Sequence, residues 1–137
     1  MRGTYQIRWQ PGNRKTKYGA KSTVYNNRRY DSKREAKYAE DLDWMIKADK
    51  LKEVTPQFQL GIYIGGRLWA TWKVDFMVIL PDGEMELREI KGFETTDYVQ
   101  KRNAFLCVQA SDCECNYITN YKNGDKLEKT VKLIVIK

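Results

Sequence analysis

The middle of the chain consists of strand-like apolar runs separated by short polar turns. Residues 54–64 (VTPQFQLGIYI) and 68–80 (LWATWKVDFMVIL) are rich in β-branched and aromatic side chains, which is typical of strands. Residues 84–91 (EMELREIK) alternate polar and apolar side chains, as in a strand with one buried face. The sequences between these runs, Gly65-Gly66 and Pro81-Asp82-Gly83, are typical of tight turns. The pattern therefore predicts three consecutive strands joined by two turns.

Two helical patterns flank these strands. Apolar residues recur at helical spacing between about residues 32 and 50, and again between about residues 96 and 110. Ser32, followed three residues later by Glu35, is a capping-box signature for the start of the first helix. The predicted order is a helix, three strands, a second helix and two short strands, the last two at about residues 115–119 and 130–136.

Basic residues are concentrated at the start of the chain. Residues 1–34 hold ten Lys or Arg against one acidic residue, a balance of +9, so the rest of this +7 chain carries −2. Five aromatic residues are interleaved with these basic residues, and Asn26-Asn27 predicts a small hairpin within residues 23–30. Such an arm is typical of contact with nucleic acid, and a solvated basic tail is the alternative. We expect phosphate contacts from Lys15, Lys17, Lys21, Arg28, Arg29 and Lys33.

Length and composition are those of one domain with a buried core. No apolar run approaches the roughly 18 residues of a membrane span, and no signal-peptide pattern follows the basic start. Three cysteines without a secretory signal favour a reduced, cytoplasmic setting. Their spacing, C-x5-C-x-C in a chain without histidine, does not match a four-ligand zinc site. We expect Cys107 in the core and Cys113 and Cys115 in a strand.

The turn at residues 81–83 determines which residues of the two central strands face each other. If this hairpin is symmetric about Asp82, the numbers of opposed residues sum to 164, so Asp75 lies opposite Glu89. Lys91 lies two residues beyond Glu89 and projects from the same face. Opposed carboxylates repel, and a buried carboxylate needs a partner, a metal ion or a raised pKa. A divalent cation would remove the repulsion, whereas in the alternative interpretation Lys91 neutralises both groups as a structural ion-pair cluster.

The order of these charged residues resembles that of the PD-(D/E)xK nuclease superfamily, which has the restriction-endonuclease-like fold. Asp75, followed by a hairpin that ends in Glu89-Ile90-Lys91, matches the motif that names the superfamily, although Val74 stands where the motif has Pro. Further segments look like those of small phage-encoded nucleases, and the resemblance covers roughly residues 17–110. These segments are 17–21 (KYGAK), 31–36 (DSKREA), 91–93 (KGF), 96–98 (TDY) and 101–102 (KR).

The resemblance implies a fold and a chemistry. The fold would be an α/β restriction-endonuclease-like core, a mixed β-sheet flanked by helices, in a single nuclease domain with a basic N-terminal arm and hairpin (1–30) and a catalytic core (31–137). Asp75, Glu89 and the backbone carbonyl of Ile90 would hold Mg²⁺ or Mn²⁺, which prefer oxygen ligands. The metal would polarise the scissile phosphate and activate a bound water. Lys91 would orient or help deprotonate that water.

The resemblance also suggests a catalytic place for Glu35 on the first helix. Helix capping explains this residue equally well, so a cap and a metal-linked carboxylate both remain open. Lys101 and Arg102, on the second helix, are expected to contact phosphates near the site, and a solvated helix face is the alternative. Gln57, just before the central hairpin, is a further candidate for positioning DNA.

Together these features predict a metal-dependent endodeoxyribonuclease, a hydrolase that acts in phage DNA replication or recombination. Small nucleases of the superfamily include junction resolvases, and this analogy suggests branched DNA, such as four-way junctions, as the substrate. A resolvase would act as a homodimer. The alternatives are a non-catalytic DNA-binding module on the same fold, which has no need of Asp75, Glu89 and Lys91 together, and a ribonuclease.

Overall fold

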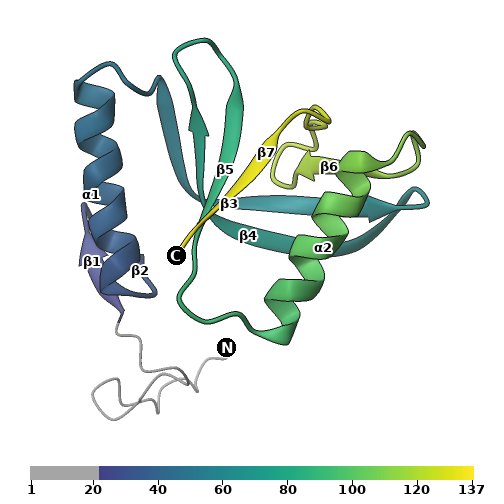
Figure 1. The fold of residues 1–137 in the computed structure, drawn as a ribbon, viewed down its shortest axis with the longest axis horizontal. Helices are drawn as coiled ribbons and strands as arrows, with labels where there is room; N and C mark the ends of the chain where they lie inside the picture. Colours follow the sequence, from purple (N-terminus) through teal and green to yellow (C-terminus); the bar gives the residue numbers. More distant parts are fainter. Residues whose placement is uncertain (1–21) are drawn as a thin grey trace, which may run out of the picture.

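A computed structural model describes residues 22–137, which form a five-stranded sheet, two helices and a separate two-stranded hairpin (Figure 1). Lys15, Lys17 and Lys21, predicted to contact nucleic acid, lie outside the described residues. In chain order the elements are β1 (Thr23–Tyr25), β2 (Arg28–Tyr30), α1 (Lys33–Lys47), β3 (Glu53–Ile64), β4 (Arg67–Ile79), β5 (Met85–Ile90), α2 (Thr96–Ala110), β6 (Tyr117–Asn120) and β7 (Lys132–Ile136).

The sheet is mixed and has the strand order β6-β3-β4-β5-β7. β7 runs parallel to β5, whereas all other neighbouring strands of the sheet are antiparallel. β1 and β2 form their own antiparallel hairpin beside α1. The expected α/β fold, a mixed sheet flanked by helices, is confirmed at this level of detail.

Local sequence signals explain where the elements begin and end. The hydroxyl oxygen of Ser32 accepts a hydrogen bond of 3.1 Å from the backbone N–H of Glu35, which caps α1. α1 ends at Lys47, earlier than expected, because Asp49 adopts a left-handed conformation (φ +58°) and stops the helix. Asn26 and Asn27 have φ of +53° and +63°, the conformation that a tight two-residue hairpin turn requires.

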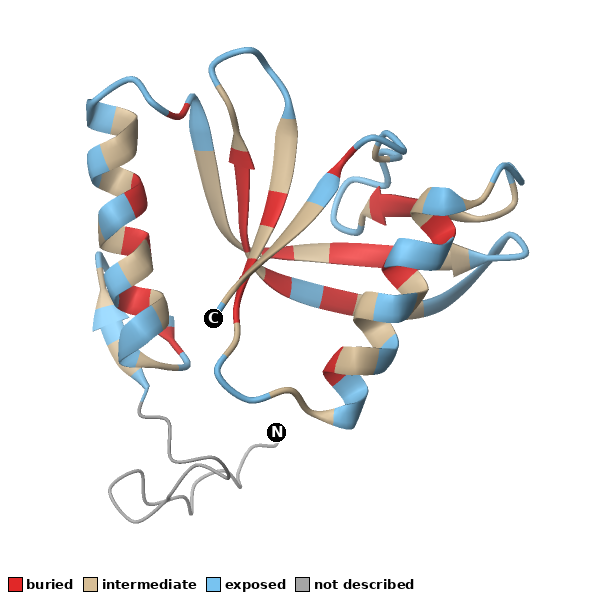
Figure 2. Ribbon diagram, viewed as in Figure 1, coloured by how far each residue is buried: buried red, intermediate tan, exposed pale blue. Residues whose placement is uncertain are grey.

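The two helices pack on different parts of the sheet, and each forms its own hydrophobic core with it. Ala36, Ala39 and Leu42 of α1 are buried against Phe76 and Val78 of β4. This first core, which we call the α1 core, also includes the β1–β2 hairpin through Tyr30, whose ring stacks on Phe76 at 6.0 Å. Figure 2 shows the buried positions of α1 turned toward the sheet.

The second core, which we call the α2 core, lies between α2 and the other face of the sheet. Tyr98 and Phe105 of α2 make edge contacts with Trp72 of β4, at centroid distances of 5.9 and 6.2 Å. The fully buried Leu60 and Leu87 belong to the same core. Both faces of β4 are therefore buried near its end, from Phe76 to Val78, as expected for a segment that is apolar on both sides, whereas Trp69 and Lys73 nearer its start are exposed.

The alternation of side chains along β4 shifts by one position at Asp75. Val74 and Met77 belong to the α2 core, while Phe76 belongs to the α1 core, so the alternation of side chains is broken by one position. Gln57 of β3 lies across from Asp75 in the β3–β4 register and has a left-handed φ of +53°. Figure 1 shows β3 and β4 changing direction near the middle of the molecule. Local distortions of this kind redirect side chains and are frequent beside active sites.

The sheet also divides at Asp75. β4 pairs with β5 only from Ile79↔Met85 to Phe76↔Arg88, yet it stays paired with β3 as far as Arg67. β5 instead continues beside β7 to Ile90. We call this divergence of β4 and β5 the fork of the sheet, and it leaves the strand positions at Asp75 and Glu89 beyond the last β4–β5 pair.

The cysteines differ from what we expected. Cys107 is exposed on α2, so its predicted place in the core is wrong. Cys113 and Cys115 lie in the loop before β6, not in a strand, and form a disulfide with each other. This loop is also held by the backbone N–H of Gly66, which donates to the carbonyl of Cys115 at 2.7 Å. No helix within residues 22–137 is long and apolar enough to span a membrane.

Candidate active site

The β4–β5 hairpin has the register that its turn predicts. The paired positions Phe76↔Arg88, Met77↔Leu87, Val78↔Glu86 and Ile79↔Met85 all sum to 164. The same register brings Asp75 and Glu89 together at the fork. The backbone N–H of Asp75 donates to Oε1 of Glu89 at 2.9 Å, and the backbone N–H of Ile90 donates to Oδ2 of Asp75 at 2.7 Å. Each carboxyl group is therefore held by the backbone of the strand that carries the other.

The carboxyl group of Glu89 is buried, and that of Asp75 beside it is half-buried. Glu89 is only 2% exposed, and burial, the charge of Asp75 and a hydrogen bond with Asp75 raise the pKa of Glu89 to about 9. Burial also raises the pKa of Asp75, although the hydrogen bonds from Glu89 and from the N–H of Ile90 oppose this shift. Near neutral pH Glu89 therefore keeps its proton, which its hydrogen bond with Asp75 lets the pair share.

Lys91 does not neutralise this pair by direct contact. Its charge lowers the pKa of both carboxyl groups, but no ion pair within 4 Å joins it to Asp75 or Glu89 in the described part of the chain. Its Nζ atom lies over the ring of Tyr98, 4.5 Å from the centroid, and the guanidinium of Arg102 lies 5.4 Å from the same centroid. The ion-pair cluster that we considered as the structural alternative is therefore not formed.

Glu35 lies at the start of α1, near enough to Asp75 for the charge of Asp75 to act on its carboxyl group. Its backbone N–H is the group that Ser32 caps, while its half-buried side chain approaches the carboxyl pair from α1. Burial, the charge of Asp75 and the charge of Asp31 raise the pKa of Glu35 to about 8, and the charge of Lys91 opposes this shift. Ser32 thus caps the backbone of Glu35, while the Glu35 carboxyl group interacts with Asp75, Asp31 and Lys91.

The donor set fits a small divalent cation bound in part by water. Asp75 and Glu89 each use one carboxyl oxygen to accept a backbone N–H, which leaves a second oxygen on each. Within residues 22–137 no three Asp, Glu, His or Cys side chains are arranged to hold a metal ion by themselves. Mg²⁺ commonly uses only one or two carboxylates and retains several waters, so two carboxylates beside a backbone carbonyl suffice.

Gln57 connects the β1–β2 hairpin to the fork. Its side-chain amide donates to the backbone carbonyl of Arg29 at 2.8 Å and accepts from Arg28 at 3.1 Å. Arg29 also donates to the hydroxyl of Ser22 at 2.8 Å, and Lys33 is exposed at the start of α1. The structure therefore brings Arg28 and Gln57, two of the residues predicted to contact DNA, next to the strand position of Asp75.

Lys101 and Arg102 are engaged in ion pairs on α2. Lys101 lies 3.3 Å from Asp97, one helical turn earlier, and Arg102 lies 3.1 Å from Glu94. Arg102 is close to the site because it shares the ring of Tyr98 with Lys91. Any phosphate contact from these two residues would compete with an existing carboxylate partner.

Two residues of the site were missed at the level of sequence. Tyr98 is only 3% exposed, and its hydroxyl has no hydrogen-bond partner among the described residues. The spacing of Tyr98 and Arg102, one helical turn apart, was the available signal for their contact. Asp31 contributes charge to both Glu35 and Asp75, and it was visible as the one acidic residue of the basic arm.

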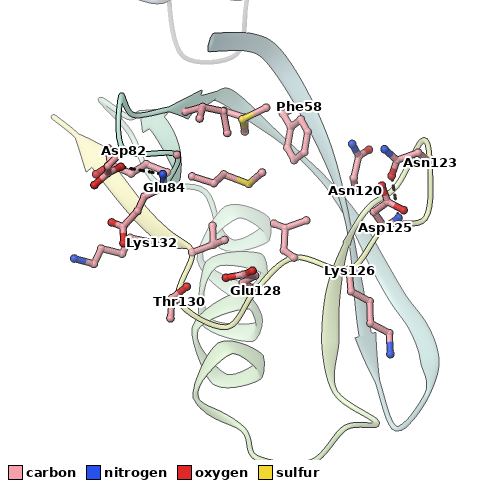
Figure 3. Close-up of a pocket in the computed structure, with 17 residues that line it drawn as sticks. Phe58, Asp82, Glu84, Asn120, Asn123, Asp125, Lys126, Glu128, Thr130 and Lys132 are labelled. Atoms are coloured by element: carbon pink, nitrogen blue, oxygen red, sulfur yellow. Dashed lines mark hydrogen bonds between the residues drawn. The ribbon is translucent and has the colours of Figure 1, made fainter. Parts of the chain in front are cut away.

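A separate pocket of about 510 Å³ lies away from these carboxyl groups (Figure 3). It opens between the β4–β5 turn, which contributes Asp82 and Glu84, and the segment from Asn120 to Lys132. Phe58, Met77, Met85 and other apolar side chains also line it. None of Glu35, Asp75, Glu89 and Lys91 lines this pocket, so the candidate active site is the fork of the sheet and not this cavity.

A family model with the description "Protein of unknown function (DUF1064)" matches residues 15–127. No curated protein and no solved structure matches the chain. The matched range runs from the basic arm to the loop after β6, so it includes Glu35, Asp75, Glu89, Lys91 and Tyr98.

Proposed function

We propose that this chain, which belongs to the DUF1064 family of proteins of unknown function, is a divalent-metal-dependent endodeoxyribonuclease. The observation that carries the proposal is the pair of the buried Glu89 and the half-buried Asp75, whose carboxyl groups are held together at the fork of the sheet. Lys91 stands two residues beyond Glu89 and contacts Tyr98 instead of neutralising the pair. A cluster that served stability alone would place its cation on its carboxylates, because an uncompensated buried charge is costly.

A divalent cation resolves the electrostatic problem of the pair. Mg²⁺ or Mn²⁺ would replace the shared proton and compensate both charges, and oxygen donors suit these hard ions. Asp75, Glu89 and the backbone carbonyl of Ile90 would hold the ion. Such an ion, when bound, polarises a phosphate oxygen and lowers the pKa of water.

The other polar groups of the site would handle substrate and protons. Lys91 would orient the attacking water and offset the negative charge that develops on the phosphate during hydrolysis. Glu35, with a pKa raised to about 8, is a carboxyl group that exchanges a proton near neutral pH. Arg28, held beside the fork by Gln57, would contact the DNA backbone.

The finer assignment of fold and biological setting is part of the same proposal. Glu35, Asp75 and Glu89 occur on helix, strand and strand in the order that the PD-(D/E)xK resemblance implies. We therefore propose a restriction-endonuclease-like core that acts on DNA in phage replication or recombination. Branched DNA and a homodimer follow from the analogy with junction resolvases.

The decisive experiment measures cleavage of labelled linear duplex, flap and four-way-junction DNA in Mg²⁺, Mn²⁺ or EDTA. The native protein would be compared with Asp75→Asn, Lys91→Met and the control Asp82→Asn, which alters an exposed aspartate in the β4–β5 turn. We expect metal-dependent cutting that is lost in Asp75→Asn and Lys91→Met and retained in Asp82→Asn.

Other outcomes would reject particular parts of the proposal. DNA binding without cutting under every metal would favour the non-catalytic DNA-binding module. Undiminished cutting by Asp75→Asn would mean that the fork is not the active site. Equal rates on linear and branched DNA would remove the analogy with resolvases, and cutting confined to RNA in a parallel assay would make the protein a ribonuclease.

A further inference from the structure

One face of the β6–β3–β4 half of the sheet is packed by neither helix within residues 22–137. The α2 core takes the alternate side chains Leu60, Ile62 and Trp72, whereas the α1 core takes residues on the other side of the bend, such as Phe76 and Val78. The intervening residues of these strands therefore point away from α2. We call these positions the open face, and they are Gln59, Gly61 and Tyr63 of β3, Trp69, Thr71 and Lys73 of β4, and Tyr117, Thr119 and the adjoining Tyr121 at β6.

Gly61 allows aromatic rings to lie close to the backbone in the centre of the open face. A Cβ atom at this position would lie 2.7 Å from the hydroxyl oxygen of Thr119, 3.1 Å from the ring of Tyr63 and 3.3 Å from that of Tyr121. Tyr63 in turn stacks on Tyr117, with ring centroids 4.7 Å apart and planes 11° apart. A glycine in a strand interior commonly marks such a close approach. The result is a platform of three tyrosine rings.

Strand β4 supplies a second row of the open face, which leads to the active site. Trp69 is 48% exposed at an irregularity of the β3–β4 ladder, and Lys73 is exposed opposite Gln59. By alternation, Trp69, Thr71 and Lys73 share the side of the strand that faces away from Trp72. Asp75 follows Lys73 by two residues. A path from Trp69 to Asp75 is therefore about 20 Å long, at roughly 3.3 Å per residue.

The aromatic and basic side chains of the open face are of the kinds that bind unpaired nucleobases. The exposed rings of Trp69 and Tyr121 offer faces on which bases can stack, and the cation Lys73 is exposed on the same strand as Trp69. The ring of Tyr117 is already covered by Tyr63 and by Lys126, whose Nζ atom lies 4.2 Å from its centroid. The open-face positions include no Asp or Glu, so they present no like charge to a phosphate backbone. Aromatic platforms with flanking basic residues bind single strands, because every base has a stacking face once it is unpaired.

We propose that the open face binds a single-stranded DNA segment whose backbone leads to the fork at Asp75. This inference rests on the proposed nuclease function, because the fork is the end toward which the bound strand would run. It adds the class of substrate to that function. The substrate would carry unpaired nucleotides beside the cleaved bond, as a flap or a branch point does. Duplex DNA does not expose base faces to such a platform.

Binding to the open face can be measured without cleavage. Fluorescence anisotropy of a labelled oligothymidylate and of a matched duplex would be recorded in EDTA, with Asp75→Asn as the uncleaving background. Adding Trp69→Ala should weaken oligothymidylate binding by about five- to 150-fold, the range expected for loss of one base-stacking ring. The matched control is Trp44→Ala, because Trp44 is also exposed beside a lysine but lies on α1.

Several results would overturn the assignment of the open face. Equal losses in Trp69→Ala and Trp44→Ala, or no loss in either, would mean that the open face does not bind single strands. If Trp69→Ala instead converts a dimer into a monomer in sedimentation while DNA affinity is unchanged, the open face is a contact between two copies of the chain.

The two proposals fail in different ways. If no DNA is cut in any metal but Trp69→Ala selectively weakens oligothymidylate binding, the binding role of the open face is supported and the nuclease function is rejected. If cutting depends on Asp75 but Trp69→Ala cuts flap DNA and linear duplex at native rates, the nuclease function is supported and the binding role of the open face is rejected.

Discussion

Asp75 and Glu89 hold each other through the backbone, because the N–H of Asp75 donates to Glu89 and the N–H after Glu89 donates to Asp75. These bonds are 2.9 and 2.7 Å long and close the fork where β4 and β5 cease to pair. One buried and one half-buried acid are thereby fixed in one geometry without a cation in contact among the described residues. Fixed geometry of charged groups before the substrate arrives is what electrostatic catalysis requires.

The metal-free protein is expected to lose stability as the pH rises from about 5 to about 9. The folded-state pKa is about 9 for Glu89 and about 8 for Glu35, both above the ordinary value of 4.5, so the folded protein binds more protons than the unfolded chain in this interval. The stabilisation is complete below the unfolded-state pKa and is lost as the pH passes through the folded-state value. Thermal melts in EDTA across this range measure the effect. Glu89→Gln should flatten the profile, and a flat native profile would contradict the burial of the pair.

Mg²⁺ is expected to raise the melting temperature more at about pH 8.5 than at about pH 6, because the ion competes with the shared proton for the carboxyl pair. Differential scanning fluorimetry with and without Mg²⁺ gives the shift at each pH. Asp75→Asn should abolish it, while Asp82→Asn in the exposed turn should keep it. A shift of equal size at both pH values would indicate that the ion binds elsewhere on the protein.

Replacing Lys91 is expected to slow cleavage without removing the metal site. Lys91→Met should reduce kcat by about 10²–10³, the usual cost of deleting one group that stabilises transition-state charge. The thermal shift caused by Mg²⁺ should remain, because Lys91 contacts Tyr98 and not the carboxyl groups. Single-turnover rates combined with metal titrations separate the two effects. Loss of both together would mean that Lys91 maintains the site instead of assisting the reaction.

Tyr98 is expected to act through its ring and not through its hydroxyl. The hydroxyl forms no hydrogen bond within 3.5 Å among the described residues, and only the charge and proximity of Arg102 act on it, so Tyr98→Phe should cleave at close to the native rate. Tyr98→Leu removes the cation–π contact, worth about 0.5–2 kcal/mol, and should lower kcat by roughly two- to 30-fold while KM changes little. Steady-state kinetics of both variants test this difference. Equal loss in Phe and Leu would assign the function to the hydroxyl.

The central hairpin could be predicted from sequence because a tight turn determines register. Once Pro81-Asp82-Gly83 is recognised as the turn, every opposed pair follows by counting, and the four observed pairs agree. The second helix was predicted with the bounds that the structure has, Thr96–Ala110, because its apolar spacing lies within one continuous segment. Signals that are local in the chain were sufficient in both cases.

The bend of the sheet could not be predicted in the same way. It depends on Gln57, whose left-handed φ is uncommon for a residue with a side chain and is retained together with bonds to Arg28 and Arg29. Those partners are far away in the sequence. The placement of Lys91 over Tyr98 and the exposure of Cys107 likewise depend on how α2 lies on the sheet. Such three-dimensional packing leaves no local pattern.

The two long strands β3 and β4 have a consequence for how the molecule unfolds. Each of them contributes side chains to both the α1 core and the α2 core, since Phe76 serves the first and Trp72 the second on the same strand. Unfolding of either core would therefore displace backbone segments whose side chains also pack in the other core. The two hydrophobic clusters are therefore expected to melt cooperatively, as one unit. Asp75 lies at their junction, where local opening would require the loss of both.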